Sequence, residues 1–150
     1  MRYFEDFPVG EVFVFGDMLV TEEDIVAFAQ AWDPQPFHLS AEVASQSPVG
    51  ELIASGWHTG ALTMRMICDG YLLDSASEGA PGVDELRWLA PVRPGDRLSV
   101  RRTTLASRVS RSRPSIGIVE FQFEVLNQTG QTALLMKSAS FLRRRPEPAP

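Results

Sequence analysis

The feature that most constrains the fold is residues 55–73, SGWHTGALTMRMICDGYLL, whose helical pattern is apolar on nearly every side. Only Arg65 and Asp69 are charged, and their spacing of four places both on one stripe of the helix. A helix that is apolar nearly all round is stable only where other elements cover it. The sequence therefore predicts a long buried central helix that the rest of the chain must wrap.

The segments after this helix have the composition of β-strands. Alternation is clearest in residues 119–125, VEFQFEV, where Val and Phe alternate with Glu and Gln as in a sheet with one buried face. The predicted strands are 84–89, 97–107, 116–126 and 132–143, and turn residues separate them at Pro94-Gly95-Asp96, Ser112-Arg113-Pro114 and 127–130. Consecutive long strands after one buried helix predict an α+β fold, with a curved antiparallel sheet around the helix.

One strand and two helical segments are predicted before the central helix. Residues 11–20, EVFVFGDMLV, read as a strand. Thr21 and Asp24 form a capping-box pattern that begins a helix, and Pro34 ends it. Residues 41–45 form a further helical turn. The apolar residues that share one face of the first helix are Ile25, Phe28, Ala29 and Trp32.

Length and composition predict a single domain over residues 1–150. An apolar content of 44% in 150 residues supports a core without disulfides or metal. The lone Cys68 cannot form an internal disulfide, which favours a reducing compartment. The start, MRYFEDFPVG, lacks the pattern of a signal peptide, and no apolar run reaches membrane-spanning length. We expect a cytoplasmic protein with no membrane partner, whose charged and proline-rich residues 143–150 form a flexible tail.

Charge is distributed unevenly along the chain. The first 86 residues hold most of the acidic side chains, whereas eight arginines lie between Arg87 and Arg113, against Asp96 alone. Nucleic-acid binding is not expected, because interleaved aromatic residues and a known nucleic-acid motif are lacking. Three explanations stay open at this point: a phosphate-bearing small molecule, an acidic surface of a partner subunit, or solvated strand faces.

A carboxylate and an imidazole lie five residues apart in the segment 33–38, DPQPFH. Two prolines restrict the backbone there, which predicts a stiff, non-helical loop. Such a loop could aim Asp33 and His38 at one water or substrate atom for proton transfer. Taken alone, Asp33 before Pro34 is more typical of a turn residue, and His38 beside Phe37 is more typical of a structural histidine.

Three segments carry a family resemblance: Asp33-x-Gln35-Pro36-x-His38 with Ala41 and Ala44 downstream, Leu52-Ile53-Ala54-Ser55-Gly56, and residues 87–96, RWLAPVRPGD. Together with the order of elements, they resemble the MaoC-like dehydratases, or R-specific enoyl-CoA hydratase family, over about residues 5 to 143. The resemblance implies the hot-dog fold, a curved antiparallel sheet wrapped around a central helix. Trp32 and Gln35 depart from the family pattern, which usually has Gly before the acid and Asn two residues after it.

The resemblance implies that Asp33 and His38 form a catalytic dyad for adding water to an α,β-unsaturated thioester, with the base unassigned. Besides the two groups that transfer protons, this reaction needs a group that stabilises the carbonyl oxygen of the thioester. The first turn of a helix offers unpaired N–H groups and a partial positive charge, so Gly56 or Trp57 would supply the oxyanion donor, with Ser55 as the N-cap. No organic cofactor is implied. No metal site is expected, because His38 and His58 lie 20 residues apart without converging cysteines; His58 is interpreted as structural.

The predicted function is a reversible hydro-lyase acting on 2-enoyl and 3-hydroxyacyl thioesters, carried by CoA or by an acyl-carrier protein. One alternative is a thioesterase of the same fold; such enzymes place an acid on the central helix, whereas Asp69 and Arg65 lie well past its start. A second is a non-catalytic binding domain whose pocket Trp32 closes. Family resemblance and open sheet edges predict at least a homodimer.

Overall fold

Five strands form one antiparallel sheet in the computed structural model, which describes residues 1–146. Their order across the sheet is β1-β3-β4-β5-β2. The bounds of β4 and β5 match the prediction, and the other three differ by at most two residues at each end. The strands are β1 (Val12–Leu19), β2 (Val83–Trp88), β3 (Arg97–Val109), β4 (Ile116–Leu126) and β5 (Thr132–Arg143).

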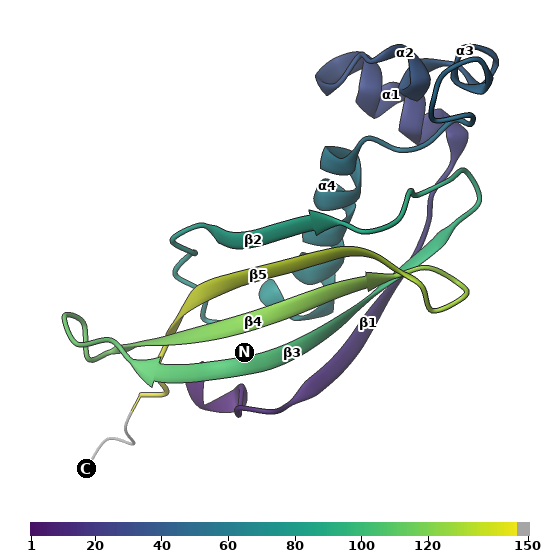
Figure 1. The fold of residues 1–150 in the computed structure, drawn as a ribbon. Coiled ribbons are helices and arrows are strands. Elements are labelled where there is room, and N and C mark those ends of the chain that lie inside the picture. The colour runs from purple at the N-terminus through teal and green to yellow at the C-terminus, as the bar shows by residue number, and fades with distance from the viewer. Residues whose placement is uncertain (147–150) are drawn as a thin grey trace.

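The helices gather on one face and at one end of the sheet. The central helix α4 lies on one face, and α1, α2 and α3 cluster beyond its N-terminal end (Figure 1). The π-helical segment η2 continues α4, so that the predicted helix over 55–73 is present in two parts. The helical elements are η1 (Phe4–Asp6), α1 (Glu22–Trp32), α2 (Pro36–Leu39), α3 (Ala41–Ser45), α4 (Gly56–Ile67) and η2 (Cys68–Leu72).

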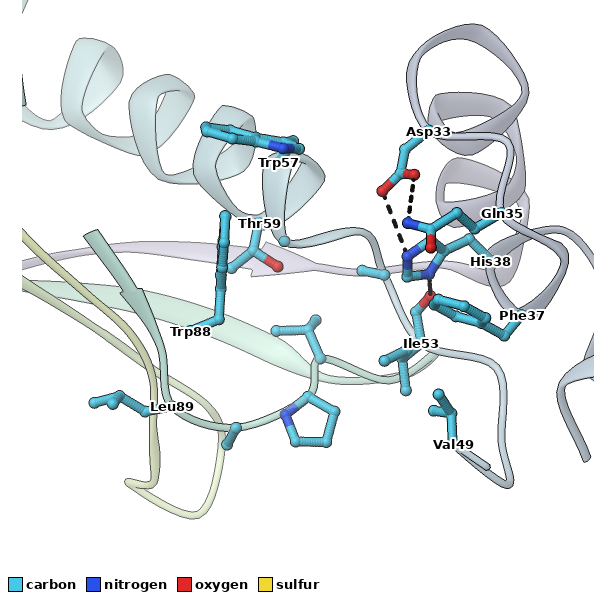
Figure 2. A pocket seen from close by; sticks show the side chains of 15 residues that line it. Asp33, Gln35, Phe37, His38, Val49, Ile53, Trp57, Thr59, Trp88 and Leu89 are labelled. Carbon is cyan, nitrogen blue, oxygen red and sulfur yellow. Dashed lines mark hydrogen bonds and ion pairs between the residues drawn. The ribbon is translucent and has the colours of Figure 1, made fainter. Parts of the chain in front are cut away.

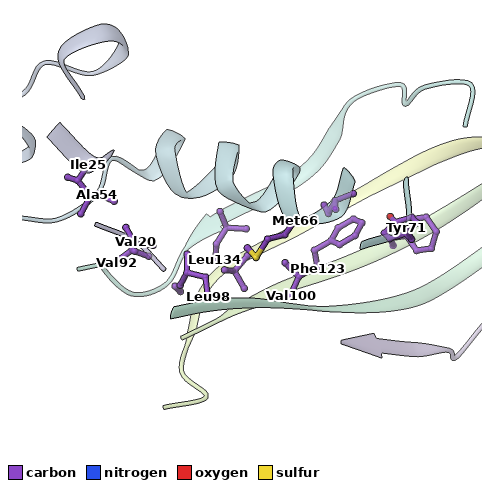
Figure 3. Close-up of a cluster of buried hydrophobic side chains, with 14 of the residues drawn as sticks. Val20, Ile25, Ala54, Met66, Tyr71, Val92, Leu98, Val100, Phe123 and Leu134 are labelled. Carbon is purple, nitrogen blue, oxygen red and sulfur yellow. The ribbon is translucent and has the colours of Figure 1, made fainter. Parts of the chain in front are cut away.

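The core lies between α4 and the concave face of the sheet (Figure 3). Alternate residues of β4 are buried, as the period-two pattern predicts, with Phe121 fully buried and Glu120 exposed. Met66 and Ile67 of α4 pack against this face. Each buried side chain of this size contributes roughly 1.5–3 kcal/mol through the removal of apolar surface from water. The sheet and the central helix therefore stabilise each other.

A bulge in β1 lets the sheet curve around the helix. The pairing of β1 with β3 shifts between Phe15 and Met18. Gly16 lies in this bulge with φ +82°, and a Cβ added there would lie 2.6 Å from Sδ of Met66. A glycine is therefore needed at this position for both its backbone conformation and the close approach of α4.

The expectation that the central helix is covered on nearly all sides is wrong for one stripe. Trp57 is 61% exposed and Met64 44% exposed, and Ala61 between them is exposed as well. The reason is geometric, because one five-stranded sheet covers one side of a helix. The apolar pattern on the other side has no cover among residues 1–146.

The uneven charge distribution is explained by ion pairs between the two halves of the chain. Arginines of the second half pair with carboxylates of the first, as in Arg93 with Glu51 and Arg97 with Asp17. Exposed pairs of this kind contribute at most about 1 kcal/mol each. The acidic groups that pair with these basic residues therefore belong largely to the same chain, and a partner subunit is not needed to supply them. Further pairs of the same kind are Lys137–Glu85, Arg143–Glu78, Arg144–Glu5 and Arg145–Asp6.

The residues just after β5 make specific contacts. The backbone N–H of Arg144 donates to Ser115 O at 2.8 Å, and that of Arg145 donates to the carboxylate of Glu5 at 2.9 Å. The remainder of the predicted tail, residues 147–150, lies outside the described residues. Among the helices of residues 1–146, none has the length and apolar character needed to cross a membrane.

Arg102 of β3 is a fully buried cation. Its guanidinium lies 4.7–5.4 Å from the ring centres of four aromatic residues and pairs with Glu11. Nε and Nη1 have no hydrogen-bond partner among the described residues, and burial lowers the pKa of this arginine. The Glu11 carboxylate is therefore the main compensation for a charge that is held out of water. The four rings belong to Phe7, Phe13, Tyr71 and Phe121.

Removing the two partners of this pair should have unequal effects on stability. Glu11→Gln leaves a buried cation without an anion, and we expect a loss of about 3 kcal/mol in the free energy of unfolding. Arg102→Met leaves Glu11, whose side chain is 31% exposed, to be hydrated, and we expect a loss of about 1 kcal/mol. Urea denaturation measures both, with the exposed Glu120→Gln as the control. A larger loss for Arg102→Met than for Glu11→Gln would contradict this account.

Candidate active site

Asp33 is positioned by the end of α1. Thr21 caps the start of this helix by accepting the Asp24 N–H at 3.1 Å, as the sequence pattern predicts. Asp33 follows the last helical residue, and its N–H donates to Ala29 O at 2.9 Å while its backbone leaves the helical conformation before Pro34. The side chain leaves the helix end at a fixed point, with 18% of its surface exposed.

His38 lies in the short helix α2 (Pro36–Leu39), so the prediction of a non-helical loop over 33–38 is wrong for residues 36–38. Pro36 occupies the first turn of that helix. Proline is favoured there because its fixed φ suits a helix and its missing N–H would have no partner anyway. Gln35 keeps the extended backbone expected before a proline. The turn of helix buries His38, whose side chain is 6% exposed.

The hydrogen bond of His38 fixes its tautomer. Nδ1 lies 2.7 Å from the carbonyl oxygen of Ile53, which can only accept, so Nδ1 carries the proton. In the neutral ring, Nε2 is then an acceptor. Nε2 faces Asp33 Oδ2 across 3.5 Å (Figure 2). Two acceptor atoms, from residues on different elements, are thus directed at the same point.

Two donors hold the Asp33 carboxylate. The hydroxyl of Ser55 donates to Oδ2 at 2.6 Å, and Nε2 of Gln35 donates to Oδ1 at 2.8 Å. The Ser55 bond is the largest cause that lowers the pKa of Asp33, followed by the Gln35 bond and the nearby His38. Because hydrogen bonds to the ionised form stabilise it, Asp33 is a carboxylate near neutral pH.

Ser55 also forms the start of the central helix. It is fully buried and caps α4 by accepting the Trp57 N–H at 3.3 Å. The N–H of Gly56, the first residue of α4, has no acceptor among the described residues. A Cβ added at Gly56 would lie 2.5 Å from Nε1 of Trp88, so the indole rests directly on this residue. The Gly56 N–H is therefore a donor without an acceptor among the described residues, at the positive end of the helix dipole.

These groups surround a cavity of about 550 Å³. Asp33 and His38 lie on one side of it, and Trp57 and Trp88 lie on the other (Figure 2). The two indoles are perpendicular, with ring centres 5.2 Å apart. The remaining wall is mostly apolar and includes Phe37, Val49, Ile53, Ala54, Leu89, Pro91 and Val92.

The structure brings together the residues singled out from the sequence. Asp33, His38, Gly56 and Trp57 line the cavity, and Ser55 reaches it through its bond to Asp33. Sequence reasoning did not identify three contributors: the Ile53 carbonyl, the Gln35 amide and the Trp88 indole. Each lies within one of the three segments of the family resemblance, which was the available signal. Their roles depend on contacts that are distant in the chain.

Two other candidates lie away from the cavity wall. His58 is buried and stacks on Phe28 at 4.7 Å, and burial lowers its pKa. Trp32 is 77% exposed and does not line the cavity. The hypothesis that Trp32 closes the pocket is therefore wrong, because α1 ends at this residue and its side chain points to solvent. Across residues 1–146, no cluster of three His, Cys, Asp or Glu side chains is arranged to hold a metal ion.

Comparison with known proteins identifies the family. The pattern of the MaoC like domain matches residues 6–120. The chain belongs to the MaoC-like domain family. A MaoC-like dehydratase from Rhodospirillum rubrum is 41% identical, with a TM-score of 0.88 over 98% of this chain and 100% of that one. The 3-hydroxybutyryl-CoA dehydratase of Methylorubrum extorquens is 35% identical over 101 residues, which are 66% of this MaoC-like chain and 61% of that protein.

A more distant structure supports the fold alone. Rv0216 of Mycobacterium tuberculosis is described as a double hot-dog fold and superposes with a TM-score of 0.79 at 17% identity. The match covers 99% of the MaoC-like chain and 46% of Rv0216. The predicted hot-dog architecture is confirmed by the sheet order, the central helix and these likenesses.

The link between Ser55 and Asp33 can be tested without any substrate. We expect Ser55→Ala to raise the pKa of Asp33, because the strongest hydrogen bond to its ionised form is lost. Carboxyl-carbon NMR over an acid titration measures this value. Ser47→Ala is the matched control, since its hydroxyl donates to Ala44 O instead. An unchanged Asp33 pKa in Ser55→Ala would contradict the assigned contact.

Proposed function

We propose that this MaoC-like protein adds water reversibly to 2-enoyl thioesters to give 3-hydroxyacyl thioesters. The observation that supports this most is the 3.5 Å approach of Asp33 Oδ2 to His38 Nε2 at the edge of an apolar cavity. The 3-hydroxybutyryl-CoA dehydratase among its relatives supports the same reaction class and a CoA thioester as substrate. An acyl-carrier thioester offers the same reacting group. The lone Cys68 favours a reducing, cytoplasmic setting.

The dyad can bind and activate one water. With Asp33 ionised and His38 in the tautomer that carries its proton on Nδ1, Nε2 is an acceptor, so a water between them can donate one hydrogen to each. In hydration, the water oxygen forms a bond to the β-carbon and loses a proton to one member of the dyad. The dyad returns one proton to the α-carbon, so its charge is unchanged after each cycle. Dehydration is the reverse.

The N-terminus of α4 suits the charge that develops on the thioester oxygen. We assign the oxyanion donor to the N–H of Gly56, because the Trp57 N–H already donates to Ser55 Oγ. A backbone donor aimed at a developing negative charge typically contributes about 3–4 kcal/mol to transition-state stabilisation. Ser55 connects the two halves of the site, since it holds Asp33 and also begins the helix that carries Gly56.

The geometry disfavours the rival reactions. Asp33 is the one carboxylate among the residues lining this cavity. Asp69, the acid of the central helical segment, is exposed and pairs with Arg65 at 2.7 Å. A thioesterase that relies on an acid from the central helix is therefore not favoured. A binding domain with a closed pocket is not favoured either, since Trp32 leaves the cavity open.

The activity is tested by following the loss of enoyl-thioester absorbance. We expect Asp33→Asn and His38→Ala each to lower kcat/KM by about 10²-fold or more, as general acid–base groups do. Asp69→Asn is the matched control and should retain activity. Release of free thiol, detected with a thiol reagent, would instead indicate a thioesterase. Full hydration activity in either dyad variant would contradict the proposed roles.

A second copy of the chain is the proposed cover for the exposed side of α4. β2 is an edge strand, with no strand on its outer side among the described residues. The exposed stripe of α4 lies on the part of the helix that the sheet does not cover. Open edges and apolar stripes are normally protected by pairing. Joining two copies there would bring both active sites close to the contact.

The dimer is testable by light scattering. We expect a mass about twice the 16.6 kDa of one chain. Ala61→Glu, on the exposed stripe of α4, should shift the protein toward monomer because a carboxylate would be buried at the contact. Leu105→Glu on β3 is the control, since Leu105 is exposed away from that stripe. A monomeric native protein would contradict the proposal.

A further inference from the structure

A second apolar cavity lies along the same helix as the dyad cavity. Its volume is about 310 Å³, and no charged side chain lines it. It lies beside the second half of α4, whereas the dyad cavity lies beside the first. α4 packs most closely on β1 and β3, which leaves space on its β2 and β5 side. The lining residues with the largest side chains are Met64, Ile67, Tyr71, Leu72, Phe123 and Met136.

The two cavities lie in line along the seam between α4 and the β2–β5 pair. Trp57 lines the first cavity and Met64 the second, and a spacing of seven places both on one face of α4, which is the partly exposed stripe described above. On β2, Trp88 lines the first and Val83 the second, about 16 Å apart for five strand residues. Inward-facing Met136 of β5 pairs with Leu86 between these two positions.

Trp88 stands between the dyad and this seam. Figure 2 shows its ring edge-on, with Asp33 and His38 on the opposite side of the cavity. The indole is held on one side by Gly56, where an added Cβ would overlap it, and on another by Trp57 at 5.2 Å. Its pairing partner on β5, Leu134, is fully buried. The ring therefore contacts Gly56 and Trp57 at the point where the first cavity ends, and 48% of the residue stays exposed.

We propose that Trp88 sets the acyl-chain length by closing the dyad cavity, and that the second cavity is the space a longer chain enters when this side chain is shortened. The inference rests on the proposed hydratase function and deepens it. A short acyl chain fits on the dyad side of Trp88 with its thioester oxygen at Gly56. Each further methylene must find room along the seam, which the indole fills.

The test compares chain lengths rather than absolute rates. We expect the native protein to favour 2-butenoyl-CoA over 2-octenoyl-CoA and 2-dodecenoyl-CoA. Trp88→Ala should raise the ratio of octenoyl to butenoyl kcat/KM about 10-fold or more, since contacts of a single methylene change this ratio by that order. Trp88→Phe should raise the same ratio by a smaller factor. This variant provides the test if Trp88→Ala folds poorly. Trp32→Ala, which removes an exposed indole outside the cavity, is the control with an unchanged ratio.

A filling substitution tests the path of the longer chain. Ser138 lines the second cavity from β5, and a phenylalanine there would occupy it. Adding Ser138→Phe to Trp88→Ala should cancel the gain on octenoyl-CoA and dodecenoyl-CoA and keep the butenoyl rate of the single variant. A persistent gain would mean that the longer chain leaves by another route, and the inference would be overturned.

Binding without reaction separates this inference from the proposed function. Butyryl-CoA and octanoyl-CoA are saturated and cannot be hydrated, so calorimetry reports only the fit of the chain. Tighter octanoyl-CoA binding by Trp88→Ala than by the native protein would support the proposal that Trp88 limits the length of the acyl chain. This result would count even if no enoyl thioester is hydrated and the proposed function fails. The inference would be overturned if the native protein bound butyryl-CoA and octanoyl-CoA with equal affinity. It would also be overturned if Trp88→Ala lowered the affinity for both by the same factor.

Discussion

The burial of α4 against the curved sheet is the contact on which the rest of the structure depends. Met66 and Ile67 fix the helix on the core, and the bulge at Gly16 lets β1 follow it. Because the helix is held along its length, its first residue has a defined place beside the ends of α1 and α2. The groups of the proposed dyad are therefore positioned by the apolar contact of the helix with the sheet as well as by the short segment that carries them.

Ser55 transmits that rigidity to the acid. Its hydroxyl donates to Asp33 and its oxygen accepts from the first turn of α4, so one fully buried residue joins two segments that are 22 positions apart. The Ile53 carbonyl accepts a hydrogen bond from His38 and so fixes the position and the tautomer of its ring. Both contacts come from the extended segment that enters α4. This segment therefore positions the proposed water site and the proposed oxyanion donor together.

The sequence predicts best those features that depend on local pattern. Strands β4 and β5 were predicted with their observed bounds because alternation and turn residues act over a few positions. The turn of helix at His38 is not predicted, because two prolines close together suggest a loop. One of them, Pro36, in fact suits the first turn of a helix. The bonds from Ser55 and Ile53, and the contact of Trp88 with Gly56, have no local signature. They depend on packing between segments far apart in the chain.

Incomplete cover of the central helix links stability with function. A sheet that wrapped α4 tightly on both sides would bury more apolar surface but leave no room for the acyl chain of the proposed substrate. Instead, close packing is confined to the side facing β1 and β3, and cavities remain toward β2 and β5. The lost packing is offset by the core under β4, where alternate side chains are fully buried. Under the proposed function, a large aromatic residue such as Trp88 divides the open side, so a single side chain can adjust the space for substrate without disturbing the packing that holds the site together.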